Sequence, residues 1–326
     1  MTVVVGACLV IAMRLVTRAT GVEAPHPNGI VATTEEAGAP DAEPLEETEP
    51  ERPATSSGYD LNKPDRILVL PKTLDEISGL SLSKEPDSLW VVNDERPTLF
   101  RISTKDGEVI QEVDLKQRGD YESVEEVDDK VYVGRSEGAV MVVDPVNGGD
   151  PQYLDFKERL GLACDMEGIA YEPRRKRLLL SCKNEGAKHR KTKKAFEIYS
   201  MPIRGTKLHR EPAFVLQEAS IDDYIKAHPE QTDLKGFYGK NFAPSGLAVN
   251  PKTGNLYILS TRAKMLVVLD DGGALARVDA LDTAVYAQPE GIAFDADGTM
   301  YISNEAHGKR ATLCVIPFVE PTKSEE

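Results

Sequence analysis

Residues 165–170 read Asp-Met-Glu-Gly-Ile-Ala, and a similar phrase occurs at four other places in the chain. The other four are Glu76-Ile77-Ser78-Gly79-Leu80, Asp120-Tyr121-Glu122-Ser123-Val124, Ala243-Pro244-Ser245-Gly246-Leu247-Ala248 and Gln288-Pro289-Glu290-Gly291-Ile292-Ala293. Aligned on the residue before the glycine (or before Ser123), they fall at positions 78, 122, 167, 245 and 290. Three of the four gaps are close to 45 residues, the length of one four-stranded β-propeller blade.

Short β-rich runs between Gly, Pro and Asp residues predict the other strands of each repeat. We expect second strands at 89–92, 131–133, 178–180, 256–259 and 300–302, and third strands at 98–102, 139–143, 196–201, 266–269 and 312–316. The last repeat ends after three strands, and residues 66–70 can supply its outer strand, which closes the ring and removes an exposed sheet edge. We therefore predict an all-β, five-bladed β-propeller over residues 64–319, followed by a tail at 320–326.

The one long gap between repeats contains residues 219–240. Residues 220–225, Ser-Ile-Asp-Asp-Tyr-Ile, are typical of a short helix capped at its start. No Glu-Gly phrase occurs within residues 219–240, so we interpret this segment as an insertion after blade three. Six blades is the alternative, if the insertion conceals one.

The N-terminal 63 residues differ in composition from the repeats. Residues 2–13 form an apolar run followed by Arg14 and Arg18, a marginal length for a bilayer span. We expect residues 1–21 to be a membrane anchor or export segment. Residues 22–63 should be a disordered tether. Between Gly21 and Gly58 there are nine acidic residues, a single arginine (Arg52) and few large apolar residues. This places the protein at the cell membrane, with the propeller on the extracytoplasmic (periplasmic) side.

The charge and the cysteines exclude some classes of site. A net charge of −15 argues against nucleic-acid binding, which needs a clustered basic surface. The four cysteines and five histidines show no zinc-ligand spacing. Cys164 and Cys182 are expected near each other at one edge of a blade, where we favour two free, half-buried thiols over a disulfide.

The shared phrases carry the chemistry. In an antiparallel blade the innermost strand starts on the face where the second strand ends, so all five phrases should meet the central channel from one face. Two carboxylates about 5 Å apart repel by roughly 3 kcal/mol at an effective dielectric of 20, and three by about 10 kcal/mol. A cation, protons or lysines must offset this repulsion if the glutamates converge. The candidate ligands are Glu122, Glu167 and Glu290, with Asp165 and Glu76.

Oxygen donors without thiolate or imidazole favour calcium over zinc. The alternative is a wide channel with separately solvated glutamates, or glutamates that each cap a neighbour's backbone amides. Blade four has Ser245 at the aligned position and Thr261 and Arg262 after its second strand. The site should therefore be lopsided, away from that blade.

These phrases, together with Tyr301-Ile302-Ser303-Asn304-Glu305, resemble the SdiA-regulated family of bacterial envelope propellers, distant relatives of the NHL-repeat propellers. The resemblance covers about residues 65–318. It implies a five-bladed propeller, calcium on acidic residues at the channel and an N-terminal membrane anchor, but no established reaction. The acidic positions that match are Glu122, Glu167 and Glu290, with Asp165 and Glu76 matching less closely.

A basic loop follows the second strand of blade three and should overhang the same face. It contains Lys183, Lys188, His189, Arg190, Lys191, Lys193 and Lys194. The loop is either a solvated hairpin or a flap that captures a phosphate or carboxylate beside calcium. Candidate ligand-binding residues are Lys183, Glu185, Arg190 and Glu305.

Three functions fit these features. The first is a non-enzymatic, calcium-binding module or scaffold at the cell envelope, with a small anionic ligand or an envelope protein as partner. The second is a calcium-dependent hydrolase of phosphate esters or lactones. No catalytic residue is assigned, because the sequence has neither a Gly-x-Ser-x-Gly elbow nor a histidine close to the shared phrases. The third is an interaction hub that uses the opposite face.

Overall fold

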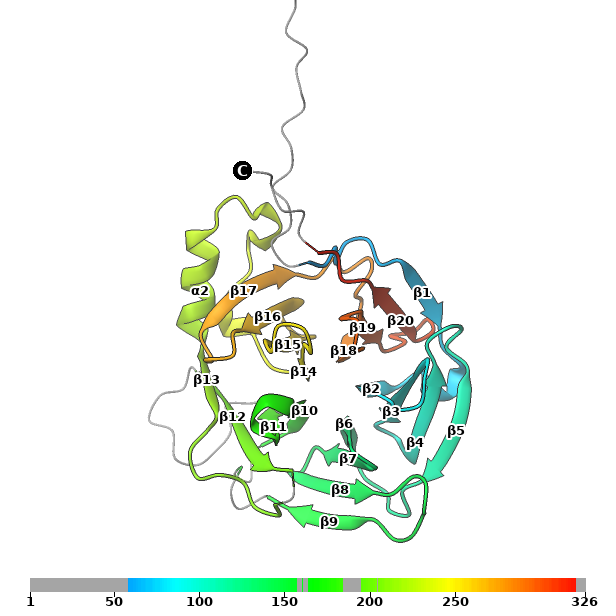
Figure 1. The fold of residues 1–326 in the computed structure, drawn as a ribbon. Helices are drawn as coiled ribbons and strands as arrows, with labels where there is room; N and C mark the ends of the chain where they lie inside the picture. Colours follow the sequence, from blue (N-terminus) through cyan, green and yellow to red (C-terminus); the bar gives the residue numbers. More distant parts are fainter. Residues whose placement is uncertain (1–57, 157–159, 161–163, 184–194, 204, 321–326) are drawn as a thin grey trace, which may run out of the picture. The chain divides into compact units, whose positions relative to one another are not determined.

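The structure is a computed structural model that describes residues 58–320, except 157–159, 161–163, 184–194 and 204. Five four-stranded antiparallel sheets surround a central axis (Figure 1). The prediction of five blades is confirmed. The expected anchor, most of the tether and most of the basic loop lie outside the described residues. Among the described residues, no helix has the length and apolar character needed to cross a bilayer.

The strands of each blade follow one another outward from the axis in chain order. Blade one contains β2 (Ile77–Leu82), β3 (Ser88–Asn93), β4 (Arg96–Ser103) and β5 (Val109–Asp114). Blade two contains β6 (Tyr121–Val127), β7 (Lys130–Arg135), β8 (Ala139–Val143) and β9 (Gln152–Asp155). Blade three contains β10 (Met166–Glu172), β11 (Arg177–Cys182), β12 (Ala195–Pro202) and β13 (Phe214–Gln217). Blade four contains β14 (Gly246–Val249), β15 (Leu256–Ser260), β16 (Met265–Leu269) and β17 (Leu275–Ala280).

Blade five joins the two ends of the domain. It contains β18 (Pro289–Phe294), β19 (Met300–Asn304), β20 (Thr312–Ile316) and, as its outer strand, β1 (Arg66–Val69). β1 pairs antiparallel with β20, from Arg66 opposite Val315 to Val69 opposite Thr312. The prediction that an N-terminal strand closes the ring is confirmed.

Residues just before β1 also belong to the propeller. Tyr59 and Leu61, which the sequence placed in the tether, are buried against blades four and five. The Tyr59 hydroxyl donates to the Gly298 carbonyl at 2.5 Å, in the turn between β18 and β19. The Gly58 carbonyl accepts from the Val319 amide at 2.7 Å, beyond the end of β20. The chain therefore enters the propeller on the face where the innermost strands end.

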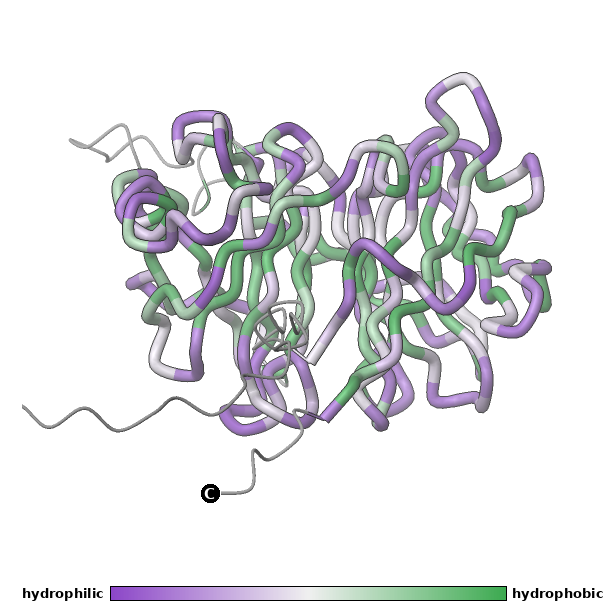
Figure 2. The backbone as a smooth tube through the Cα atoms, turned by 90° about the horizontal axis from the view of Figure 1, so that it is seen from above, coloured by the Kyte–Doolittle hydropathy of each residue, from purple (hydrophilic) through white to green (hydrophobic). Residues whose placement is uncertain are grey.

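The hydrophobic core lies between the blades. Each of five buried clusters joins the facing sides of two neighbouring blades. The second strands bury both sides, so β3 and β11 have nearly continuous apolar sequences (Ser-Leu-Trp-Val-Val-Asn and Arg-Leu-Leu-Leu-Ser-Cys). Figure 2 shows this from the side, with hydrophobic residues along the strands and hydrophilic residues in the loops at both faces.

The insertion after blade three contains α2 (Glu218–Ala227), η3 (Thr232–Leu234) and η4 (Gly239–Asn241). Two further 3-10 turns are η1 (Lys72–Leu74) and η2 (Pro173–Arg175). The predicted helix is present, but it follows β13 directly, begins two residues before Ser220 and has no side-chain cap. Tertiary contact takes the place of the cap, since Ile221 and Leu234 are buried in the core between blades three and four.

The glycine of the shared phrase is explained by the closeness of the innermost strands. A Cβ added at Gly291 would lie 2.5 Å from the Ser78 carbonyl oxygen of the next blade, and one at Gly246 would lie 2.6 Å from the Glu290 carbonyl oxygen. Backbone atoms leave no room for a side chain at these positions.

Replacing Gly291 with alanine should therefore destabilise the propeller by about 3 kcal/mol, the usual cost of overpacking a tight core. At this size the midpoint of thermal unfolding should fall by about 6–12 °C. The control is Gly272→Ala, because among the described residues a Cβ there would come close only to the Asp270 carboxylate, at 3.2 Å. Equal midpoints for the two variants would contradict the packing argument.

Candidate functional site

The predicted glutamates lie at the face where the innermost strands begin, which we call the acidic face. Glu122, Glu167 and Glu290 are the second residues of β6, β10 and β18. In all three strands the pairing register shifts at this position, so the glutamate is not paired in the ladder. A β-bulge of this kind re-aims its side chain away from the sheet surface. The bulges thus turn the repeated glutamate toward the axis.

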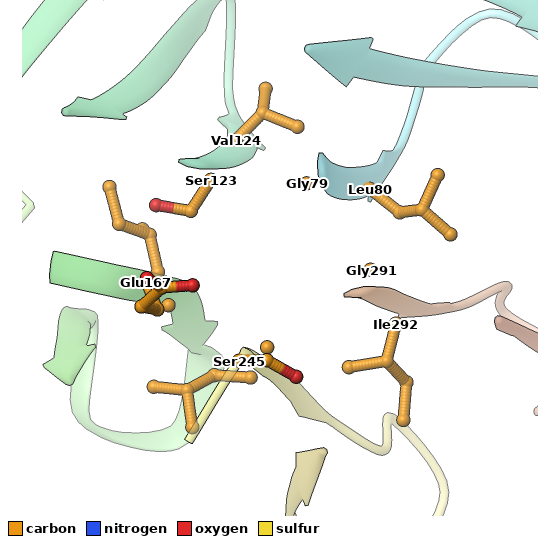
Figure 3. A pocket seen from close by; sticks show the side chains of 12 residues that line it. Gly79, Leu80, Ser123, Val124, Glu167, Ser245, Gly291 and Ile292 are labelled. Carbon is orange, nitrogen blue, oxygen red and sulfur yellow. The ribbon is translucent and has the colours of Figure 1, made fainter. Parts of the chain in front are cut away.

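Glu167 is the most deeply buried of the three, with 2% of its surface exposed. Its carboxylate extends toward the space enclosed by the five innermost strands, as Figure 3 shows. Lys183 Nζ donates to Glu167 Oε1 at 2.9 Å, and the lysine side chain remains 48% exposed. Lys183, predicted to bind an anionic ligand, is therefore an ion-pair partner of a predicted metal ligand.

A disulfide holds the segments that carry this pair. Cys164 and Cys182 are bonded, with their Cα atoms 5.3 Å apart, so our expectation of two free thiols is wrong. The sequence placed both cysteines at one blade edge but could not show that Met166 pairs with Cys182 across β10 and β11. The Lys183 amide also donates to the Asp165 carbonyl at 2.7 Å. Glu167 and Lys183 are thus fixed from both sides.

The acids of blades two and three influence each other strongly. Burial, followed by the Glu167 and Asp120 carboxylates, raises the pKa of Glu122 to about 9. Burial also raises the pKa of Glu167 to about 8, where Asp165 and Glu290 add to the rise and Lys183 opposes it. Near neutral pH, each of these carboxyl groups is therefore stabilised by a bound proton or by a nearby cation such as Lys183.

Glu290 completes the group from blade five. Burial raises its pKa, while Thr261 and Lys183 act in the opposite direction. Thr261 Oγ1 donates to Glu290 Oε2 at 3.1 Å. Blade four therefore contributes a hydroxyl donor where blades two, three and five contribute carboxylates. We call Glu122, Glu167 and Glu290 the acidic ring.

A second acidic group borders the ring at blades five, one and two. Burial, then Glu76 and Asp120, raises the pKa of Asp94 to about 6. Burial and a hydrogen bond with Glu76 raise the pKa of Glu305 to about 7, and Glu305 also accepts from Gln288. Asp94 Oδ1 is buried without a hydrogen-bond partner among the described residues. Such an orphaned oxygen is a vacant acceptor for a proton donor or a cation.

A small cavity lies between the five innermost strands, beside Glu167. Its lining includes Gly79, Ser123, Gly168, Gly246 and Gly291, one from each blade. The labelled apolar side chains of Leu80, Val124 and Ile292 point away from the axis, between the blades (Figure 3). The cavity volume is about 10 Å³, which is room for roughly one water molecule.

The predicted site residues differ in their place: some form the acidic ring, some act on it or on the neighbouring acids, and some lie outside the described residues. Glu122, Glu167 and Glu290 interact across the axis, Asp165 acts on Glu167, and Glu76 acts on Asp94 and Glu305. Glu185 and Arg190 lie outside the described residues. No group of three or more His, Cys, Asp or Glu side chains in the described part of the chain is drawn together around a single metal position.

Sequence reasoning did not assign Asp94, Asp120 and Thr261 to the site. The signal for all three was their place in the repeat. Asp120 stands two residues before Glu122, while Asp94 and Thr261 directly follow second strands that end on the acidic face.

The model of the SdiA-regulated family matches residues 65–307, which include blades one to four, three strands of blade five and the acidic ring. The chain belongs to the SdiA-regulated family. No curated protein matches its sequence.

Solved structures similar to this SdiA-regulated protein include a glutaminyl cyclase of Myxococcus xanthus, with a TM-score of 0.52 and 12% identity over 78% of this chain and 94% of that one. A luciferin-regenerating enzyme has a TM-score of 0.48 and 9% identity, over 78% of this chain and 95% of that one. A chain of a nidogen/laminin complex has a TM-score of 0.43 and 14% identity, over 70% of this chain and 72% of that one. At these identities the likeness concerns the fold.

The acidic ring predicts how the stability of this SdiA-regulated protein varies with pH in a chelator. The folded pKa values of Glu122 and Glu167 lie above the ordinary 4.5, so the folded protein retains protons that the unfolded chain releases. Their contribution to stability is fully present below pH 4.5 and is lost as the pH rises toward 9. We expect a loss of about 2 kcal/mol between pH 5 and 9, or about 4–8 °C in the thermal midpoint.

In Glu122→Gln the same melts should show a weaker dependence on pH, because the amide cannot ionise. The control is Glu112→Gln, at an exposed position of β5, which should retain the wild-type dependence of the thermal midpoint on pH. A slope left unchanged by Glu122→Gln would show that the ring does not carry the effect.

Proposed function

We propose that the acidic ring binds calcium and that the protein is a non-enzymatic binding module of the cell envelope. The observation that carries the proposal is the crowding of three buried or half-buried glutamates at the axis, with the pKa of Glu122 raised to about 9 and that of Glu167 to about 8. Such carboxylates gain more from a divalent cation than solvated ones do, because the cation relieves both their burial and their mutual repulsion.

The donor set agrees with calcium. Carboxylate oxygens from Glu122, Glu167 and Glu290 would hold the ion, with Asp165 and Glu76 nearby. Because the described side chains are not gathered around one metal position, they would have to turn toward the ion, and calcium takes six to eight oxygen ligands in flexible geometry. Thr261 and the orphaned Asp94 oxygen add polar groups at the rim. Bound calcium would supply two positive charges, whereas Lys183 supplies one.

Lys183 must leave for the ion to be held by Glu167. Its ammonium contacts Glu167 Oε1 at 2.9 Å, so the lysine and a cation compete for the same oxygen. The lysine side chain is already 48% exposed, so its ammonium can turn into solvent. We infer that Lys183 neutralises the ring when calcium is scarce.

An extracytoplasmic location is part of the proposal. The Cys164–Cys182 disulfide supports it, because disulfides persist mainly in oxidising compartments. The apolar run at residues 2–13 would attach the protein to the membrane. The partner would be a small anionic ligand or an envelope protein, and the net charge of −15 disfavours nucleic acid.

The test is thermal unfolding at pH 7.5, in EGTA and in a series of calcium concentrations. A ligand bound to the folded state alone adds about 2.7 kcal/mol at 100 times its dissociation constant, which should raise the midpoint by roughly 5–11 °C. Glu167→Gln should remove at least half of this rise, while Glu112→Gln should leave it intact. An unchanged wild-type midpoint would exclude calcium from the ring.

Lys183→Met separates a cation site from a purely structural ion pair. Without the competing ammonium, calcium should bind about tenfold more tightly in isothermal titration, and the protein in EGTA should be less stable than the wild type. If Lys183→Met leaves calcium affinity unchanged, the lysine and the ion do not share Glu167.

A calcium-dependent hydrolase is the second candidate function. The observation in its favour is the pKa of Glu305, raised to about 7, which suits a general acid or base near neutral pH. Phosphate esters, aryl esters and lactones should be tested with added calcium. Turnover that is lost in Glu305→Gln, with an unchanged thermal midpoint, would favour the enzyme; no turnover on any substrate class would favour the binding module.

A further inference from the structure

A separate groove opens on the acidic face beside blade four. One wall is the insertion, with Phe237, Tyr238 and Asn241. The other wall is the loop between β15 and β16, with Arg262 and Lys264. Its volume is about 190 Å³, enough for a small organic molecule, and we call it the Arg262 groove. Nothing in the calcium proposal uses it.

The charge of the groove is opposite to that of the protein. Arg262 and Lys264 both line it, and none of the described residues that line it is acidic, although the chain has a net charge of −15. Arg262 is exposed, and no hydrogen bond or ion pair within the described residues engages its guanidinium. An arginine and a lysine that line the same groove, with no carboxylate in that lining, favour an anion there.

Lys264 is held in position for this role. Its Nζ donates to the Ala287 carbonyl at 2.6 Å, which leaves its other two N–H groups for a ligand. The guanidinium of Arg262 offers a planar fork of donors that matches phosphate, while the lysine acts as a point charge. This pair favours a phosphate group.

The walls favour a ligand with an apolar body. Met265 is fully buried at the base, Phe237 is half-buried, and Tyr238 is 51% exposed. Lys240 lies over the Tyr238 ring with Nζ 5.2 Å from its centroid, which adds a further positive charge at the rim. An exposed aromatic ring beside Arg262 and Lys264 is suited to contact a flat, apolar group that carries an anion.

We propose that the Arg262 groove binds a small organic phosphate monoester with an aromatic or apolar body. Arg262 and Lys264 hold the phosphate, and Tyr238 and Phe237 contact the body. The groove adjoins the acidic ring through the same loop, because Thr261 contacts Glu290 and Lys264 acts electrostatically on it. Phosphate binding nevertheless requires no cation in the ring.

The experiment is isothermal titration of the full chain with phenyl phosphate, in low-salt buffer with EGTA. Inorganic phosphate and phenol serve as comparison ligands. Phenyl phosphate should bind more tightly than either. Arg262→Gln should weaken it at least tenfold. The matched control is Arg210→Gln, which removes the same charge from a highly exposed position and should change the affinity less than twofold.

Tyr238→Ala tests the contact with the body of the ligand. It should weaken phenyl phosphate by several-fold and leave inorganic phosphate unchanged. Binding that appears only with calcium would assign the phosphate to the ring and overturn the groove. Absence of phenyl phosphate binding, or equal losses in Arg262→Gln and Arg210→Gln, would also overturn it. Failure of calcium to bind, with phosphate binding intact in EGTA, would refute the proposed cation site alone.

Discussion

Repulsion between carboxylates at the axis is the constraint on which the site depends. Five innermost strands begin at the same face, and a small residue near the start of each one, glycine in four blades and Ser123 in blade two, allows the strands to approach one another closely. An acid placed at the start of one strand therefore becomes a neighbour of acids two blades away in the sequence. Lys183, Thr261 and retained protons are the means by which this chain balances that charge.

The repeat made most of the architecture predictable from sequence. The spacing of the shared phrases predicted the blades, and the three-stranded last repeat predicted the pairing of β1 with β20. The start of α2 was misplaced because the helix continues directly from β13 without a cap. Tyr59 and Leu61 were assigned to the tether because composition alone does not reveal a hydrogen bond to Gly298, more than two hundred residues away.

The candidate site was predicted less completely than the fold. Repetition identified Glu122, Glu167 and Glu290, since identical positions in identical blades must face the same axis. It could not identify what touches them, because side-chain partners depend on bulges and register within individual blades. The pairing of Lys183 with Glu167 and the bonding of Cys164 to Cys182 are of this kind. The Arg262 groove was missed for another reason, because the insertion that forms one wall belongs to no repeat.

The position of Gly58 has a consequence for how the molecule meets its surroundings. The chain joins the propeller beside Gly298 and Val319, on the side remote from the glutamates. A label or fusion partner placed directly before Gly58 would therefore join the face opposite the glutamates and the Arg262 groove. It would leave both proposed binding regions open to solutes.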